Sequence, residues 1–346
     1  MIFRGNENGI IQSGKLGYRA DIDGLRAVAV LPVVLFHAGI SPFSGGYVGV
    51  DVFFVISGFL ITSILRDQIA SKQFSLLWFY ERRARRILPA LFAVAAATFV
   101  GGWFVSIPDE YVSLSQSALS TIFFSSNIFF YISLDYFSSA AEFHPLLHTW
   151  SLAVEEQFYI FFPLFLMIIP ANWLGFSVTI VFVSSLSLSV YFVEIDPAAA
   201  FYLLPMRAWE LMLGAMVALQ VLPTLRARSA RQIGAVVGIA VIIAPTILYG
   251  AETPFPGLAA LPPCIGATLL VSMGADTAVG RALASKPVVF VGLISYSLYL
   301  WHWPILALLR LSGGAVELSA VQAWAAIALS FVFAILSWRY IERPFR

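Results

Sequence analysis

Apolar residues are arranged along this chain in long runs that are separated by short polar stretches. Each run has roughly 17–23 residues, close to the length that an α-helix needs to cross the hydrocarbon core of a bilayer. The pattern therefore predicts a polytopic all-α membrane protein, a bundle of about ten transmembrane helices. The predicted spans lie near residues 22–40, 47–65, 87–107, 150–170, 173–193, 206–222, 232–250, 257–274, 288–310 and 319–341.

An eleventh segment, residues 111–133, is apolar at one end and rich in serine throughout. Basic residues help to choose its topology, because cytoplasmic loops carry an excess of Lys and Arg. If this segment does not cross, all the basic stretches fall on one side of the membrane. These stretches are residues 4–19, 66–86, 226–231, 281–286 and 339–346. We therefore predict that both termini are cytoplasmic and that 111–133 is one extra interfacial or re-entrant helix on the outer side.

Composition agrees with a membrane protein and excludes several other classes. Of the 346 residues, 60% are hydrophobic and only 11% are charged, whereas a soluble domain has about 25% charged residues. The 20 Lys and Arg residues balance 19 Asp and Glu residues, which argues against a large nucleic-acid face. The single cysteine, Cys264, excludes a disulfide scaffold and is expected to be a small buried packing residue.

The domain organisation is simple. Residues 1–19 are polar and glycine-rich and lack the apolar core of a signal peptide, so they predict a cytoplasmic N-terminal tail. Residues 20–346 show no repeat and no linker between soluble domains, and they predict a single transmembrane domain. The function is therefore expected to lie within the bundle and at its mouths.

Ionisable residues inside the predicted spans are candidates for a site, because burying them in a membrane is costly. Arg26 and His37 are eleven residues apart in the first span. At about 100° and 1.5 Å per residue they share one helix face and lie roughly 16 Å apart along the axis. They are either a functional pair or a snorkelling arginine with a histidine satisfied inside the bundle. Asp21, Asp23 and Glu155 are the carboxylates that could orient the His37 ring.

A second group of polar residues is expected in the outer half of the bundle. In span nine, Tyr299 and His302 share a face with Ser295, and His148 precedes span four. Span four begins with TWSLAVEEQFY, where Ser151 and Glu155 are one turn apart. They could serve catalysis, or Trp150 and Tyr159 could mark this end as part of an aromatic belt. The H-x3-H spacing at 144–148 is a weak metal pattern interrupted by Pro145, and no metal is expected.

Basic residues mark the opposite side. The run ERRARRILP (81–89) places Arg82, Arg83 and Arg86 just before span three. Arginine matches phosphate oxygens bidentately, so this cluster could hold a phosphorylated ligand such as coenzyme A. It could equally be a topology anchor at anionic lipid headgroups. In span two, Ser57 and Gly58 permit either close helix packing or the approach of a thin ligand chain.

Five of these patterns occur together in a known order. Arg26-x10-His37, FFVISG (53–58), RRARR (82–86), WSLAVEEQFY (150–159) and SYSLYLWH (295–302) resemble the acyltransferase 3 family, over about residues 18–345. The opening YRADIDGLRAVAVLPVVLFHAG (18–39) is similar to its bacterial O-acetyltransferase branch, which modifies O-antigen and other surface polysaccharides.

The resemblance implies a membrane-bound O-acyltransferase in the bacterial inner membrane. Such an enzyme moves an acyl group, usually acetyl, from cytoplasmic acyl-CoA to a hydroxyl of an extracytoplasmic glycan such as lipopolysaccharide O-antigen. The resemblance also implies a group of catalytic residues and a group that binds coenzyme A. His302, Tyr299 and His148 are expected to contact the acceptor. The catalytic group is His37, Arg26, Glu155 and Ser151, and the coenzyme group is Arg82, Arg83, Arg86, Ser57 and Gly58.

Several alternatives stay open on the sequence alone. His37 can act as a base or carry the acyl group transiently. Family members with this opening often continue into a further span and a periplasmic SGNH-type domain, so the chain can be a stand-alone transferase or part of a longer protein. A transporter or flippase for a lipid-linked glycan or anion would also use buried Arg and His, although no paired halves with broken helices are visible. A non-catalytic assembly protein is the third class.

Overall fold

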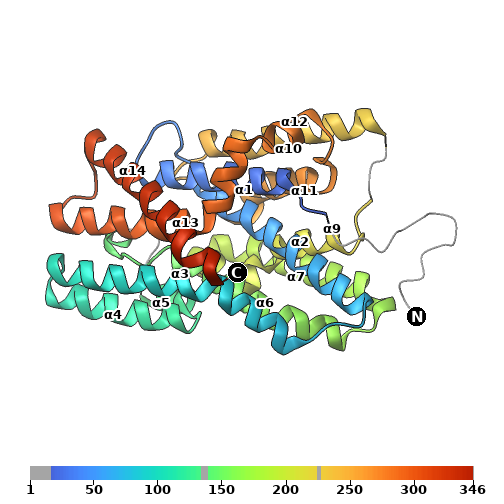
Figure 1. Ribbon diagram of the computed structural model, residues 1–346, viewed down its shortest axis with the longest axis horizontal. Helices are drawn as coiled ribbons and strands as arrows, with labels where there is room; N and C mark the ends of the chain where they lie inside the picture. Colours follow the sequence, from blue (N-terminus) through green and yellow to red (C-terminus); the bar gives the residue numbers. More distant parts are fainter. Residues whose placement is uncertain (1–16, 134–138, 224–226, 346) are drawn as a thin grey trace.

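The computed structural model describes residues 17–133, 139–223 and 227–345, and all regular elements in these ranges are helical (Figure 1). The predicted all-α class is therefore confirmed for this part of the chain. Most of the N-terminal tail, including Arg4 and Lys15, lies outside the described residues, as do Arg226 and Arg346.

Seven helical segments within the described residues are long and apolar enough to cross a membrane. They are η1 with α2 (Gly46–Val48 and Gly49–Ala70), α3 (Leu76–Val105), α6 (Thr149–Ile168), α7 (Ala171–Ile195), α10 (Arg228–Leu248), α13 (Lys286–Gly313), and α14 with η4 and α15 (Ala320–Ser337, Trp338–Glu342 and Arg343–Phe345). The number of ten spans predicted from the apolar runs is wrong by this criterion.

The three remaining predicted spans are helices that differ from a simple span. Helix α1 (Ala20–His37) carries three charged residues near its beginning. Helix α9 (Leu204–Ala218) has 15 residues, which at 1.5 Å per residue is shorter than the roughly 30 Å hydrocarbon core. The segment formed by η3 (Gly257–Ala260) and α11 (Leu261–Met273) is also short. The apolar runs overestimated the count because they register neither the charges at the beginning of α1 nor the short lengths of α9 and α11.

Residues 108–133 form two helices in place of the single helix that was predicted. Helix α4 (Pro108–Ile122) turns back beside α3, with the Phe99 and Tyr111 rings 4.9 Å apart, and α5 (Ser126–Ser133) reverses again (Figure 1). Phe124, at the turn, has a positive φ of 52°. Gln157 of α6 donates to the Phe124 carbonyl at 2.9 Å, so the tip of this hairpin packs against the middle of α6.

The centre of the bundle is the crossing of α2 and α9. A Cβ added at Gly58 would lie 1.9 Å from the Leu211 carbonyl oxygen, and one added at Gly214 would lie 2.0 Å from that of Val55. Glycine is therefore required at both positions for the two backbones to meet. The contact holds α9 inside the molecule, where Trp209 and Leu211 are fully buried.

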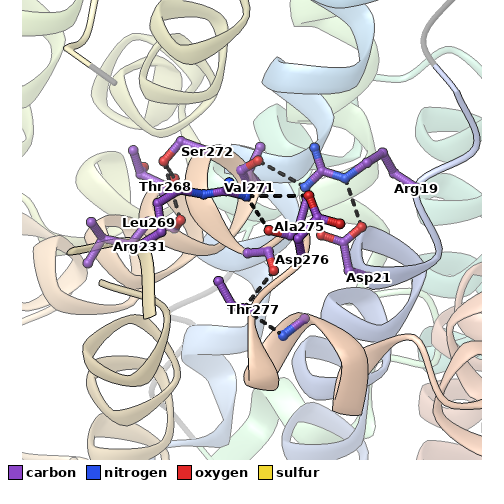
Figure 2. A network of polar contacts seen from close by, with 12 residues as sticks. Arg19, Asp21, Arg231, Thr268, Leu269, Val271, Ser272, Ala275, Asp276 and Thr277 are labelled. Atoms are coloured by element: carbon purple, nitrogen blue, oxygen red, sulfur yellow. Dashed lines mark hydrogen bonds and ion pairs between the residues drawn. The ribbon is translucent and has the colours of Figure 1, made fainter. Parts of the chain in front are cut away.

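Basic residues gather at one end of the molecule. Arg19 pairs with Asp21 at 2.7 Å and donates to the Val271 carbonyl, while Arg231 donates to the Ala275 carbonyl (Figure 2). These contacts tie the beginning of α1 to the end of α11, and the beginning of α10 to the loop between α11 and α12 (Ala278–Leu283). Arg281 donates to the Asp276 carbonyl of the same loop. Basic residues that are far apart in the sequence thus meet around one loop.

Two short elements complete the opposite end. The 3-10 helix η2 (Ser139–Phe143) precedes α6, and α8 (Pro197–Tyr202) precedes α9. Asp196 caps α8 by accepting from the Ala199 backbone N–H at 2.9 Å, and it also accepts from the Tyr131 hydroxyl. Asp196 therefore links α5 to the beginning of α8, at the end of the bundle where α1 ends with His37.

Candidate active site

Three cavities lie in succession through the bundle, and we name them by their chemistry. The basic cavity has a volume of about 750 Å³, the central cavity about 80 Å³ and the histidine cavity about 10 Å³. The residues that the argument uses are Arg26, Arg82, Arg83 and Arg86 in the basic cavity; Ser57, Ser151, Glu155, Tyr159 and Tyr299 in the central cavity; and His37, His148, Arg207 and Trp303 in the histidine cavity.

Neighbouring cavities share their walls. Arg26, Arg83 and Arg86 line both the basic and the central cavity. Val50 and Tyr299 line both the central and the histidine cavity. The three cavities are therefore neighbours, arranged along α1 from Arg26 to its last residue, His37.

The arginine cluster is held by aromatic rings. The Arg83 guanidinium lies 4.6 Å from the centre of the Tyr159 ring, and that of Arg82 lies 4.5 Å from the Trp78 ring. Stacking on a ring fixes the plane of a guanidinium and leaves its edge N–H groups available. Arg85, by contrast, is exposed and forms an ion pair with Glu81 at 2.7 Å.

Two hydrogen-bonded groups line the central cavity. Glu155 accepts hydrogen bonds from the hydroxyls of Ser57 and Tyr159. Ser151 and Tyr299 share a hydrogen bond of 2.6 Å between their hydroxyl oxygens. The aromatic-belt alternative for this end of α6 is not supported, because the Trp150 and Tyr159 side chains are both buried.

The structure brings His37 to His302, although 265 positions separate them in the sequence. The His37 Nδ1 and His302 Nε2 atoms are 2.9 Å apart, and the edge of Trp303 meets the His37 ring at a centroid distance of 4.5 Å. The suggestion that a carboxylate orients His37 is therefore wrong for this structure. Asp21 and Asp23 pair with Arg19 and Arg26 instead, and Glu155 is bonded within the central cavity.

His148 lies beside this pair. Its ring meets that of His302 edge-on at 5.8 Å, and it lines the histidine cavity. Both of its ring nitrogens are buried and form no hydrogen bond within the described residues. The Tyr299 hydroxyl donates to the His148 carbonyl at 2.8 Å, which fixes the backbone at this point.

Two side chains of α13, Arg310 and Trp303, connect His37 to the segment before α6. Arg310 donates to the His37 carbonyl at 2.8 Å and pairs with Glu142 at 2.8 Å, and the Trp303 indole donates to the His144 carbonyl at 2.8 Å. Burial lowers the pKa of His144 and raises the pKa of Glu142. His144 is thus biased towards its neutral form. Arg310 was not predicted from the sequence as a site residue, although an ionisable residue at the end of the predicted span 288–310 could have indicated it.

A second buried charge cluster was also missed, although two of its members stand in the sequence run RAWEL. Arg207 pairs with Asp51 at 2.9 Å and with Glu210 at 3.3 Å, and all three are fully buried. The rings of Phe54, Trp150, Phe201 and Phe255 surround the guanidinium at 5.5–5.7 Å.

This cluster is the nearest approach to a metal site among the residues that the structure describes. Ligand atoms of Asp51, Glu210 and Cys264 lie within 4.8 Å of one another. The Arg207 guanidinium already pairs with both carboxylates, so a second cation there would meet its repulsion. Cys264 is fully buried, in agreement with its predicted packing role.

The residues expected to catalyse the reaction, to bind coenzyme A or to contact the acceptor all line the three cavities, except Gly58 and His302. Gly58 faces the backbone of α9, which supports the packing interpretation of this residue. His302 is fully buried behind His37 and contacts that residue rather than a cavity.

Comparison with known proteins agrees with the resemblance found in the motifs. Residues 19–339 match the family model described as acyltransferase domain. The chain is 31% identical to the peptidoglycan O-acetyltransferase OatA of Listeria monocytogenes, with 95% of this chain and 56% of that protein aligned. It is 33% identical to the putative membrane-bound transacylase BcsY of Komagataeibacter xylinus, with 94% and 82% aligned.

The O-acetyltransferase OatA of Staphylococcus aureus is 32% identical over 95% of this chain and 57% of its own length. The chain therefore spans little more than half of the OatA proteins. No solved structure matches. With a family model covering residues 19–339 and these relatives, the chain belongs to the acyltransferase 3 family.

Proposed function

We propose that this chain is a membrane-bound O-acyltransferase that moves an acetyl group from cytoplasmic acyl-CoA to a hydroxyl of an extracytoplasmic glycan. The observation that carries the proposal is the succession of cavities from Arg82, Arg83 and Arg86 to His37. A donor with a phosphorylated head and a long, thin acylated arm fits this arrangement. The relatives of this chain are named as acetyltransferases and a transacylase, which supports acyl transfer as the reaction.

The donor phosphates bind in the basic cavity in this proposal. Arg82, Arg83 and Arg86 offer guanidinium N–H groups, which form charge-assisted hydrogen bonds to phosphate oxygens. The arm passes through the central cavity beside Ser57 and Glu155, and its thioester reaches the neighbourhood of His37. Arg26, at the junction of the two cavities, contributes a further positive charge to the same ligand.

His37 acts as the general base on the acceptor hydroxyl. The imidazole takes the hydroxyl proton as the oxygen attacks the thioester carbonyl, and the new ester forms when the carbon–sulfur bond breaks. The imidazolium then returns its proton to the departing thiolate. Ser151, Tyr299 and His148 supply hydrogen-bonding groups for the acceptor, because they lie where the central and histidine cavities meet.

The relatives suggest the chemical class of the acceptor, and the loop charges suggest the orientation of the protein in the membrane. The Listeria relative is named for peptidoglycan, and a surface polysaccharide such as lipopolysaccharide O-antigen presents the same hydroxyl chemistry. We place the protein in a bacterial cytoplasmic membrane with its basic end inside, since cytoplasmic loops carry the excess of Lys and Arg. The histidine cavity then lies towards the outside, where the glycan is found.

The direct test is an acetyl-transfer assay with the purified chain, labelled acetyl-CoA and candidate glycans. Base-labile label on the glycan is the expected product. His37→Ala should lower kcat by about 10²–10⁴-fold, the usual contribution of general-base catalysis. A folded His37→Ala protein with near-normal transfer would remove His37 from the proposal.

The same assay tests the donor site. Arg83→Ala should weaken acetyl-CoA binding by roughly 10- to 150-fold, because a hydrogen bond to a charged group contributes about 1.5–3 kcal/mol. Arg228→Ala is the matched control, since Arg228 is an exposed arginine at the beginning of α10 and outside the basic cavity. Equal donor affinity in both variants would reduce the cluster to a topology anchor. Glycan movement without donor would favour the transporter.

A further inference from the structure

The hydrogen bonds around His302 determine where its proton lies. Its Nδ1 is 2.7 Å from the Tyr299 carbonyl oxygen and 3.2 Å from that of Leu298, one turn earlier in α13. A carbonyl oxygen can only accept, so Nδ1 must carry the proton. His302 is 0% exposed, and a charged imidazolium is costly at such a site, so the ring is neutral and its Nε2 is an acceptor.

This arrangement determines the tautomer of His37 as well. The Nδ1 of His37 lies 2.9 Å from the accepting Nε2 of His302, and a hydrogen bond forms only if His37 Nδ1 carries a proton. A neutral His37 then has its lone pair on Nε2. That atom forms no hydrogen bond with the part of the chain that the structure describes, whereas the His37 ring lines the histidine cavity.

We propose that His302 is a positioning residue that holds His37 in the Nδ1–H tautomer and so presents a basic Nε2 to the acceptor hydroxyl. The carbonyl of Tyr299, His302 and His37 form a chain in which each group fixes the proton of the next. When His37 accepts a proton on Nε2, its Nδ1–H bond to His302 strengthens, because a charged donor forms a stronger hydrogen bond.

Contacts around the two rings fit this role better than direct binding of an acceptor by His302. The His37 and His302 rings are nearly parallel, at 17° and a centroid distance of 5.2 Å, and Trp303 packs edge-on against His37. Arg310 holds the His37 carbonyl at 2.8 Å. His37 is thus restrained on its ring face, at its Nδ1 and at its backbone, while no hydrogen bond within the described residues engages its Nε2.

The tautomer can be measured without any assay of transfer. ¹⁵N-histidine is incorporated into the full chain, and NMR of the protein in lipid distinguishes protonated from unprotonated ring nitrogens. His37→Gln identifies the His37 signals by their loss. We expect His37 to be neutral with the proton on Nδ1, and His302→Leu to shift it towards the Nε2–H form that free histidine prefers. A wild-type His37 with its proton on Nε2, or an unchanged tautomer in His302→Leu, overturns the proposal.

Kinetics add a readout that a merely structural role would not change. His302→Leu should lower kcat by about 10²–10⁴-fold with little change in the KM for acetyl-CoA. His302→Gln should recover part of that loss, since its carbonyl oxygen can accept from His37 Nδ1 in place of Nε2. Trp301→Phe is the control, because Trp301 is adjacent on α13 but stacks on Phe333 at 4.7 Å. Equal losses in the Leu and Gln variants contradict the proposal.

This inference rests on the proposed function only for its kinetic consequence. If the tautomer responds to His302 but no acetyl group is transferred, the histidine pair stands and the acyltransferase assignment fails. If transfer depends on His37 while its proton lies on Nε2, the assignment stands and the positioning role fails.

Discussion

Tyr159 joins the arginine cluster to the hydrogen-bonded group around Glu155. Its hydroxyl donates to Glu155, and its ring lies 4.6 Å from the Arg83 guanidinium. The ring is buried, and it stacks on the cation at the wall between the basic and central cavities. A single side chain therefore determines both the direction of Arg83 and the hydrogen bonding of Glu155.

Replacing this ring should affect the donor site through Arg83. We expect Tyr159→Leu to raise the dissociation constant of acetyl-CoA by roughly 5- to 30-fold, the equivalent of about 1–2 kcal/mol for a desolvated cation–π contact. Tyr159→Phe keeps the ring and loses only the hydroxyl, so its rise should be smaller. Titration calorimetry on the two variants measures this difference, and equal affinities would show that the ring does not position Arg83.

At the scale of helices, glycines rather than polar residues bring the site together. Gly58 and Gly214 let α2 and α9 cross in backbone contact. The same α2 carries Ser57 into the central cavity, and α9 carries Arg207 to the histidine cavity. A wider crossing would separate these side chains from their neighbours.

Gly58→Ala tests this crossing. The added Cβ would lie 1.9 Å from the Leu211 carbonyl oxygen, so the helices must move apart, at a cost of about 1–3 kcal/mol or more. We expect a lower midpoint of thermal unfolding in detergent. Gly175→Ala in α7 is the matched control, since its Cβ would meet only Val221 at 3.6 Å, and alanine favours a helix. A Gly58→Ala protein as stable as this control would contradict the packing role.

The sequence predicted the helices better than it predicted their contacts. Apolar runs located α2, α6 and α13 to within a few residues, because burial in lipid imposes a length and a composition. The turn at Phe124 and the shortness of α9 depend on neighbours, and no local pattern encodes them. The motifs likewise identified His37 and His302 separately. Their hydrogen bond depends on how α1 packs against α13, which residue spacing cannot reveal.

The whole molecule has two chemically different ends. Arg19, Arg231 and Arg281 meet around one loop, and Arg82, Arg83 and Arg86 line the cavity that Arg19 also borders. The other end holds His37 and the loop between α13 and α14, joined to it through Arg310. In the proposed reaction, the phosphorylated head of the donor would bind at the arginine end and the glycan acceptor would approach the end that holds His37.

The orientation of these ends in the membrane can be measured with single cysteines. The native Cys264 is fully buried and should not react, so it gives a silent background. Arg228→Cys places an exposed thiol at the basic end, and Glu317→Cys places one in the loop between α13 and α14. We expect a membrane-impermeant maleimide to label Glu317→Cys in intact cells and Arg228→Cys only after permeabilisation, because the excess of Arg and Lys stays in the cytoplasm. The reverse pattern would place the arginine cluster outside, away from cytoplasmic acyl-CoA, and the proposed direction of transfer would be wrong.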